Sequence, residues 1–563
     1  MMLLKHIPAI LSLGLLTIGL VRPAFAGLWQ YSATVDSVDN GEIHGHPRAY
    51  LWIPPRCKHI RAMVVAQHNL LEESILIDPQ FRATLAKLDI AEVWIMPNIS
   101  YPFDFSKGVG EKFDDTFKAL AAESGYSEIA TAPVVPMGHS AAASYPWNFA
   151  AWAPERTLAV LSIHGDTPET NMTGFGGKNP DWGDRNIDGI PGLFVMGQYE
   201  WIDGRTQPGL DYVAKHPMTP LAMLPDIGHG HFDTSSEQVA FLCLFLRKAA
   251  EYRLPKKSPV GGPTPLKPVD PQQGWLVDRW EPSEGRVPTA RLEPQSGRKY
   301  PSAPYNAYKG DRANAFWCFD REMAEATEYY GKGRKLDPSR KIVYVQDGKV
   351  LGPKSGAAGG MPRPQLLMDP DGRTFHFAAY AVHGDVAPGT LWNDATAAAA
   401  SAEPLTPKVL CGPLAHVAGD TYRLEFDQSG FNSPYRSFNA FLSTMIPTSE
   451  KAMAQSQPGG VFVTRNTEGV GNAITFPAIA DVTDTRKPIT LNATSSSGLP
   501  VAYYVDSGPA EIVGDTLKFT PIPPRSKFPV AVRIVAWQWG RSTAPQVKSA
   551  DPVVMTFHVL CAK

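Results

Sequence analysis

Short apolar runs alternate with longer amphipathic segments through the first half of the chain. The runs stand at 62–66, 93–96, 134–137, 158–163 and 193–196. Between two of them, segment 111–122 repeats apolar residues at helical spacing with charged residues in between. Parallel strands that are buried on both faces are continuously apolar, and helices connect them. The pattern therefore predicts a parallel sheet wrapped by helices.

The pattern changes at a proline-rich segment, 255–274, which contains six prolines and no apolar periodicity. Such a segment is typical of an extended linker between domains. Downstream, residues 275–471 consist of short alternating runs separated by Gly, Pro and Asp, and residues 472–563 alternate more regularly. Both patterns predict β-rich domains, the first of unknown role and the second a β-sandwich of antiparallel strands.

The N-terminus has the pattern of a secretory signal peptide. Basic residues precede an apolar run at 7–21, and Ala24-Phe25-Ala26 supplies small residues at a cleavage site. The prediction is removal of residues 1–26, a catalytic domain that starts at 27, and a secreted or periplasmic location in a bacterium. No cysteine follows the cleavage site, so no lipid anchor on the membrane is expected.

The composition of the chain indicates which binding partners and which disulfide bridges to expect. A chain of 563 residues is longer than one hydrophobic core usually supports, so several domains are expected. Its net charge of -2, without a basic tract, predicts no nucleic-acid or anionic-membrane partner. Five cysteines are too few for a disulfide-built scaffold. We consider two pairings by domain, Cys57 with Cys243 and Cys318 with Cys411, against the alternative of buried free thiols.

The stretch VVPMGHSAA, 134–142, places Ser140 between small residues where a buried run ends. When a strand reverses sharply into a helix, small neighbours let the backbones approach and the serine hydroxyl is left exposed. A serine needs a histidine to take its proton and an acid to orient that histidine. Glu200 follows the run at 193–196, and DIGHGHF at 226–232 precedes a helix with a predicted Thr234 cap.

Together these motifs resemble the α/β-hydrolase superfamily over residues 48–254, and segment 48–69 resembles the entry strands of its secreted esterases. The resemblance implies an α/β-hydrolase domain at 27–254 with Ser140 as nucleophile, Glu200 as acid and His229 as base. His231 stays open as the base, as do Asp203 and Asp166 as the acid. The resemblance also implies an oxyanion hole made by the N–H groups of Ala141 and Asn69, with Leu70 next.

Three aromatic residues fall near the predicted mouth of this site. We expect Trp147, Trp182 and Trp201 to bind substrate, a sugar ring or an aromatic acyl group, unless they belong to the core. The histidines of 44–46 and 229–231 could hold a metal ion, but no HExxH helix or carboxylate cluster completes such a site. No metal or cofactor is therefore expected.

The run SSGLPVAYYVDSGPA at 496–510 resembles immunoglobulin-like repeats of bacterial surface and secreted proteins. The sequence as a whole predicts a secreted serine hydrolase of carboxylic esters, with an extracellular ester as its partner and acylated polysaccharide as one candidate. Two alternatives stay open: a serine peptidase on the same fold, because the same triad serves amides, and a surface-binding protein with a vestigial hydrolase domain.

Overall fold

A computed structural model represents the protein. It describes residues 28–36, 48–172, 177–257, 259, 262–280, 298–330, 337, 339–352, 361–393, 396–431, 438–449, 452 and 454–561. The predicted signal peptide, 1–26, and the histidine pair of 44–46 lie outside the described residues.

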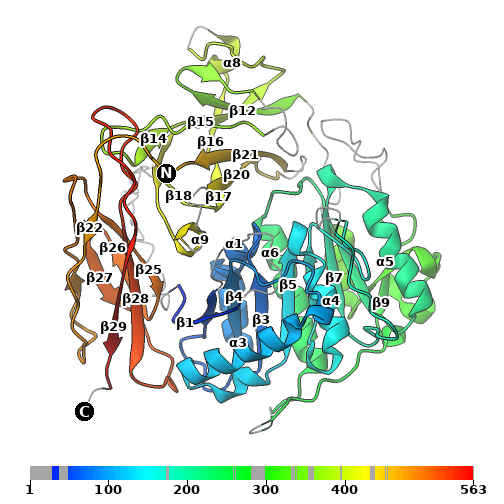
Figure 1. Cartoon of the computed structure of the whole chain (residues 1–563). Coiled ribbons are helices and arrows are strands. Elements are labelled where there is room, and N and C mark those ends of the chain that lie inside the picture. Colours follow the sequence, from blue (N-terminus) through cyan, green and yellow to red (C-terminus); the bar gives the residue numbers. More distant parts are fainter. Residues whose placement is uncertain are drawn as a thin grey trace, which may run out of the picture.

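An eight-stranded sheet forms the centre of the N-terminal part (Figure 1). Its strands lie in the order β1-β2-β4-β3-β5-β6-β7-β8, where β2 is antiparallel to its neighbours and β3 to β8 are mutually parallel. This is the strand order of the α/β-hydrolase fold, and the predicted parallel sheet is confirmed. The bounds are β1 Tyr31–Thr34, β2 Arg48–Trp52, β3 Ala62–Gln67, β4 Ile90–Met96, β5 Val134–His139, β6 Val160–Ile163, β7 Gly192–Gly197 and β8 Leu221–Asp226.

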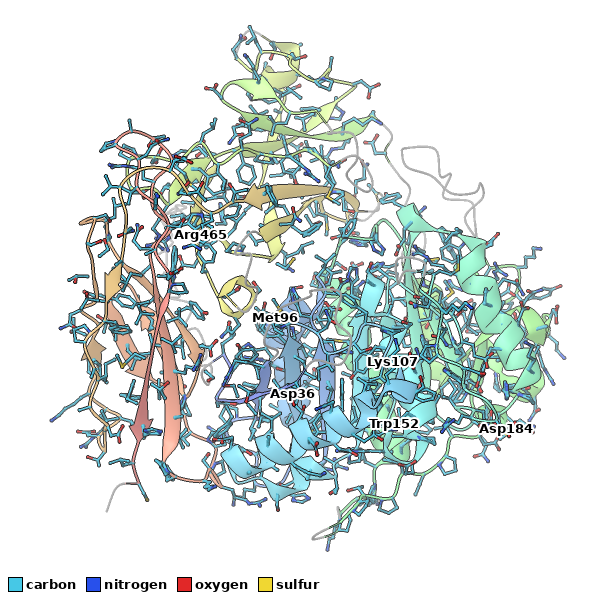
Figure 2. The ribbon with its side chains drawn as sticks, in the orientation of Figure 1. Asp36, Met96, Lys107, Trp152, Asp184 and Arg465 are labelled. Carbon is cyan, nitrogen blue, oxygen red and sulfur yellow. The ribbon has the colours of Figure 1, made fainter. Side chains whose placement is uncertain are left out.

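Helices cover both faces of this sheet, because alternate strand residues form separate cores. Val64 and Leu193 face a core shared with α2 and α6, whereas Val65 and Phe194 face cores shared with α3, α4 and α5. The packing is close: a Cβ on Gly110 of α3 would lie 2.2 Å from the ring of Trp152. Trp152, the last residue of α4, is labelled in Figure 2. The helices are α1 Glu72–Leu76, α2 Pro79–Leu88, α3 Val109–Ser124, α4 Tyr145–Trp152, α5 Asp203–Lys215 and α6 Ser236–Arg253.

Local signals set the ends of these helices. The predicted helix at 111–122 is confirmed as α3, which ends at Gly125 in the left-handed conformation, with φ of 82°. The cap of α6 was predicted one residue too early. Ser235, not Thr234, accepts a hydrogen bond from the N–H of Gln238, because Ser235 is the residue in extended conformation directly before the helix.

The segment after α6 runs along the part with the α/β-hydrolase fold, residues 28–254, which we call the hydrolase part for its fold. The N–H of Val269 donates to the carbonyl of Gly189 at 2.9 Å, and a three-stranded sheet and α7 follow. Trp317 and Met323 of these elements lie in the same core as α6. The elements are β9 Trp275–Asp278, β10 Ala303–Pro304, β11 Ala315–Cys318 and α7 Arg321–Tyr329.

The described residues between 339 and 463 are β-rich, as predicted, and form three small antiparallel sheets. The first is β13-β12-β15-β16, the second β14-β19-β18 and the third β17-β20-β21. The elements are β12 Arg340–Gln346, β13 Lys349–Val350, β14 Thr374–His376, β15 Ala378–His383, α8 Ala397–Ala400, β16 Glu403–Leu405, β17 Lys408–Cys411, β18 Leu414–Ala418, β19 Thr421–Leu424, α9 Gln428–Phe431, β20 Phe438–Ile446 and β21 Gln455–Val463.

The last hundred residues form two three-stranded antiparallel sheets and one strand pair. Leu517 of one sheet and Ile534 and Phe557 of the other lie in one core, so the two sheets pack face to face. The β-rich prediction is confirmed, and the immunoglobulin-like assignment stays a prediction. The strands are β22 Ile474–Thr475, β23 Ile489–Thr490, β24 Thr494–Ser495, β25 Ala502–Ser507, β26 Ala510–Val513, β27 Thr516–Phe519, β28 Val530–Trp537 and β29 Val553–Val559.

These C-terminal sheets lie beside the β1 edge of the central sheet (Figure 1). A buried carboxylate, Asp506, joins the two parts. The hydroxyl of Tyr50 on β2 donates to it at 3.0 Å, and Arg533 on β28 donates to its other oxygen at 2.8 Å. The contact therefore combines apolar packing with a buried, satisfied charge.

The cysteines do not form the bridges that we considered. Cys57, Cys243, Cys318 and Cys411 are buried free thiols. Cys57 and Cys243 lie in cores on opposite faces of the central sheet, which places them out of reach of each other. Within the described part of the chain, no helix combines the length and apolar character that a bilayer crossing requires.

Replacing Tyr50 by Phe removes one hydrogen bond from buried Asp506 without changing the apolar volume. We expect a loss of about 1–3 kcal/mol in stability, because a buried carboxylate oxygen loses its donor. Urea denaturation of the two proteins measures it. Tyr300→Phe, at an exposed ring, is the matched control and should change stability by less than about 0.5 kcal/mol; equal effects of the two changes would contradict the role of Asp506.

Candidate active site

Ser140 occupies a strained turn directly after β5. Its φ is 51°, in the left-handed region that side chains other than glycine rarely adopt. The turn requires small neighbours: a Cβ on Gly138 would lie 2.0 Å from the carbonyl of Ala142, and one on Gly165 would lie 1.9 Å from the Cβ of Ala143. This is the geometry of a nucleophile elbow, as the spacing of small residues around Ser140 predicted.

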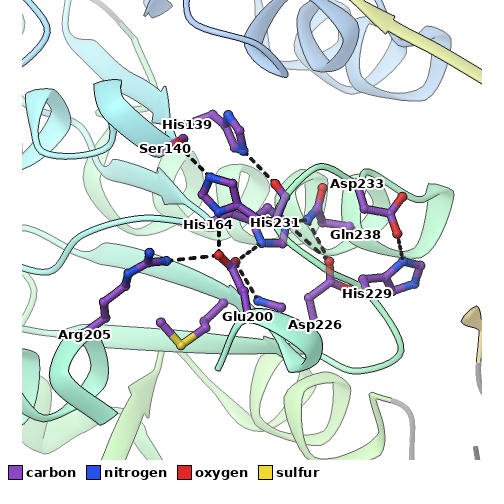
Figure 3. A network of polar contacts seen from close by, with 12 residues as sticks. His139, Ser140, His164, Glu200, Arg205, Asp226, His229, His231, Asp233 and Gln238 are labelled. Carbon is purple, nitrogen blue, oxygen red and sulfur yellow. Dashed lines mark hydrogen bonds and ion pairs between the residues drawn. The ribbon is translucent and has the colours of Figure 1, made fainter. Parts of the chain in front are cut away.

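Ser140, His231 and Glu200 form a continuous chain of hydrogen bonds (Figure 3). The Oγ of Ser140 lies 2.7 Å from Nε2 of His231, and Nδ1 of His231 lies 2.5 Å from Oε2 of Glu200. These partners fit the neutral imidazole that donates from Nδ1 to the carboxylate and accepts the serine proton at Nε2. The three residues follow β5, β7 and β8, so the carboxyl ends of parallel strands bring them together.

His229, which we preferred as the base, does not reach Ser140. Its Nδ1 lies 2.7 Å from Oδ2 of Asp233, and its side chain is 2% exposed. The N–H of Tyr199 donates to the carbonyl of His229 at 3.0 Å, which fixes this residue at the strand end with its ring turned to Asp233. His231, two residues further, is the histidine that meets the serine. This corrects the order of the two candidates.

The two alternative candidates for the acid, Asp203 and Asp166, have other partners than His231. Asp203 begins α5 with its side chain 73% exposed and pairs with Arg279 at 3.0 Å. Asp166 accepts a hydrogen bond from the N–H of Met172 at 2.8 Å and so supports the loop after β6. Glu200 is the carboxylate that the structure brings to His231.

The side chain of Glu200 is only 9% exposed and accepts hydrogen bonds from four donors. They are His231, His164 at 2.6 Å, Arg205 at 3.0 Å and the N–H of Gly197 at 3.2 Å. Burial alone would raise the pKa of Glu200, but the charges and hydrogen bonds of His231 and His164 outweigh it and hold this pKa well below its usual range. The carboxylate is therefore kept ionised beside the histidine.

Sequence reasoning did not place His164 in contact with Glu200. His164 follows β6, is fully buried and has φ of 49°. The amide nitrogen of Gln238 lies 2.8 Å both from its Nε2 and from Oδ2 of Asp226, whose other oxygen accepts from Tyr330. Burial lowers the pKa of His164, but Glu200, Asp226 and Asp233 together outweigh this effect, so the net direction is upward. Its position after an apolar run was the one signal in the sequence.

The loop after β3 is organised by Glu72 on α1. The N–H groups of Asn69 and Leu70 donate to Oε2 of Glu72 at 3.0 and 2.8 Å, and the N–H of His139 donates to its Oε1 at 2.8 Å. The N–H of Asn69, our candidate for the oxyanion hole, is thus directed to a carboxylate and not to the site. Burial raises the pKa of Glu72 to about 7, against the effect of these donors. The N–H of Ala141, beside the serine, stays the candidate donor.

Our three candidates for substrate binding are core residues instead. Trp147, Trp182 and Trp201 are at most 2% exposed and lie in one apolar cluster. Their indole N–H groups donate to the carbonyl of Asp166, to Asn148 and to Asp203. A buried indole with a satisfied N–H stabilises the core and cannot meet a substrate.

Among the residues that the structure describes, no three His, Cys, Asp or Glu side chains are grouped as metal ligands. The histidines at 229 and 231 separate to different partners, Asp233 and Glu200.

No protein-family model matches the chain. No curated protein sequence matches it either. Among solved structures, a fluorophosphonate-binding serine hydrolase F of Staphylococcus aureus is 12% identical, with 39% of this chain and 97% of that chain covered and a TM-score of 0.26. An S-formylglutathione hydrolase from Agrobacterium tumefaciens is 11% identical (39% and 94% covered, TM-score 0.28), and a Pyrobaculum calidifontis esterase is 14% identical (39% and 84% covered, TM-score 0.29). We assign the α/β-hydrolase fold from the strand order and the elbow.

The pairing of His229 with Asp233 predicts a pH-dependent stability. Burial lowers the pKa of His229, but Asp226 and Asp233 raise it more, from 6.5 to about 9. The folded state therefore binds the proton more tightly, so a stabilisation of about 3 kcal/mol is fully present below pH 6.5 and is lost as the pH rises through 9. His229→Gln should remove this part of the decline in melting temperature between pH 6.5 and 9. An unchanged slope would contradict a charged His229.

Proposed function

We propose that the protein is a serine hydrolase that cleaves carboxylic esters through an acyl-serine intermediate. The observation that carries this proposal is the chain of hydrogen bonds from Ser140 through His231 to Glu200, built on the elbow after β5. A serine hydroxyl is a weak nucleophile by itself, and a histidine held by a buried, ionised carboxylate is the arrangement that activates it.

His231 takes the proton of Ser140 at Nε2 as Oγ attacks the ester carbonyl carbon. The C=O electron pair moves to the oxygen, and the tetrahedral intermediate then returns it and expels the alcohol, which receives the proton from His231. Water repeats the sequence on the acyl-serine, with His231 again as base, and releases the acid and Ser140. Glu200 stabilises the imidazolium that forms in each half and keeps its charge throughout.

The oxyanion that forms in both halves needs donors fixed in advance. The N–H of Ala141 supplies one in this proposal. Glu72 has a supporting role because its two oxygens connect the loop at 69–70 to His139, the residue before the serine. The carboxylate therefore holds the loop and the elbow at a fixed distance, although it does not contact the substrate.

The substrate class rests on sequence. Segment 48–69 resembles the entry strands of secreted esterases, the N-terminus has a signal-peptide pattern, and residues 496–510 resemble a module of bacterial surface and secreted proteins. An ester outside the cytoplasm, such as an acylated polysaccharide, is the substrate that fits these features. Secretion itself is tested by finding the chain in the medium or periplasm with residue 27 at its N-terminus.

Ser140→Ala tests the nucleophile. Residues 27–563 should hydrolyse a small activated acetyl ester and be labelled by a fluorophosphonate, and Ser140→Ala should lose both, with kcat/KM lower by at least about 10³. A folded wild type that neither turns over the ester nor is labelled would sink the serine-hydrolase proposal.

The choice of histidine is tested separately with a matched pair. His231→Gln should lower kcat about 10³-fold or more, because the base is lost. His229→Gln should lower it by no more than about tenfold, because Gln can still donate to Asp233. The opposite ranking in ester hydrolysis would show that His229 is the base.

Glu72→Gln keeps the size of the side chain and replaces one acceptor by a donor that faces backbone N–H groups. We expect kcat to fall about tenfold or more with little change in KM, since the loop at 69–70 moves relative to the elbow. Steady-state kinetics with the acetyl ester measure it, beside a thermal melt to establish folding. Full activity in a folded variant would remove Glu72 from this role.

A further inference from the structure

The loop that carries His231 lies against a strand far away in sequence. We define the histidine loop as residues 227–235, between β8 and α6. Along β20, Ala440 and Leu442 point into the core of the β-rich part, whereas Phe441 packs against the core of the hydrolase part. Side chains of a strand alternate between its faces, so Ser443 shares the face of Phe441. This face meets the histidine loop.

The first contact is a buried polar chain. The hydroxyl of Ser443 donates to Oδ1 of Asp233 at 2.9 Å, and the other oxygen of Asp233 lies 2.7 Å from Nδ1 of His229. All three side chains are buried. The side chain of Ser456 on β21 also acts on Asp233, whose pKa it helps to lower. Two strands of the β-rich part thus complete the solvation of a carboxylate that belongs to the hydrolase part.

The second contact is aromatic and adjoins the candidate base. The rings of Phe232 and Phe441 stack with centroids 5.4 Å apart and planes 23° apart. Phe232 in turn meets the ring of His231 edge to face, with centroids 4.6 Å apart. The position of Phe441 is therefore passed to His231 through one intervening ring.

A third contact reaches the acid turn as well. The hydroxyl of Tyr199, next to Glu200, donates to the carbonyl of Ala454 at 3.2 Å. A Cβ on Gly228 would lie 2.7 Å from the same carbonyl oxygen, so the histidine loop passes close to Ala454. The β-rich part consequently contacts both loops that supply the partners of Ser140.

We propose that the sheet β17-β20-β21 positions residues of the active site. Ser443 and Phe441 are the positioning residues: they hold the histidine loop, and this keeps His231 aligned between Ser140 and Glu200. The inference rests on the proposed function and deepens it. It assigns to the β-rich part a role in catalysis that a spacer or a separate binding module does not have.

The test compares Ser443→Ala and Ser443→Ala/Ser456→Ala with Tyr422→Phe in the full chain. Tyr422→Phe is the matched control because it also removes one buried hydroxyl of the β-rich part, whose partner is the carbonyl of Pro407. We expect kcat for the acetyl ester and the rate of fluorophosphonate labelling to fall about fivefold in the single variant and at least tenfold in the double variant, with KM within threefold. Tyr422→Phe should stay within twofold in all three.

Asp233→Asn, which keeps the size of the side chain, provides a double-mutant cycle. If Ser443 acts through Asp233, the losses of Ser443→Ala and Asp233→Asn should not multiply in the combined variant. Ser443→Thr restores a hydroxyl and should recover most of the activity. Losses that multiply fully, with no recovery by Thr, would overturn the path through Asp233.

A spectroscopic readout separates this inference from the proposed function. The Nδ1 proton of His231, in its short hydrogen bond to Glu200, should give a far-downfield proton resonance that His231→Gln removes. Ser443→Ala/Ser456→Ala should shift or broaden it, and Tyr422→Phe should leave it unchanged. This measurement needs no turnover, so it tests the positioning even if the wild type is not labelled. An unaltered resonance in a folded double variant would overturn the inference.

Discussion

The site depends on the hydrogen bonds that hold the ionised carboxylate of Glu200. A buried charge is costly unless several donors replace its water. His231, His164, Arg205 and the N–H of Gly197 do so. They come from the loops after β6 and β8, from α5 and from the last residue of β7. The hydrogen bonds to this one carboxylate therefore fix the relative positions of three strand ends. Ser140, after β5, is connected to the carboxylate through His231.

Parts of the chain outside the α/β-hydrolase fold support this arrangement. Tyr330, beyond the proline-rich segment, reaches Asp226, and Ser443 on β20 reaches Asp233. The C-terminal sheets lie beside the β1 edge, and Asp506 joins them to Tyr50 on the neighbouring strand β2. Figure 1 shows these parts gathered around the central sheet. The β-rich half is thus packed onto the hydrolase part, and the proline-rich segment does not separate them.

Predictions from sequence succeeded where the cause is local. The apolar runs gave the strands, the helical repeat gave α3, and the small residues around Ser140 gave the elbow, because strand burial, helical periodicity and turn sterics act over a few residues. They were wrong where the cause is distant. Which of His229 and His231 meets Ser140 depends on Asp233 and Tyr199, which hold His229 elsewhere. The three tryptophans are buried by elements that a local pattern does not contain.

By itself, the sequence determined which residues end the strands of the sheet, and so placed Ser140, Glu200 and two histidines at one edge. Only the tertiary structure decided which histidine contacts the serine and which backbone N–H groups donate to Glu72. It also placed β20 against the histidine loop. The physical reason is that hydrogen bonds and buried charges select partners by position in space, whereas a sequence pattern reports burial and turns. The sequence pattern does not distinguish two histidines separated by one glycine. In the folded protein they differ because His229 hydrogen-bonds to Asp233 and His231 to Glu200.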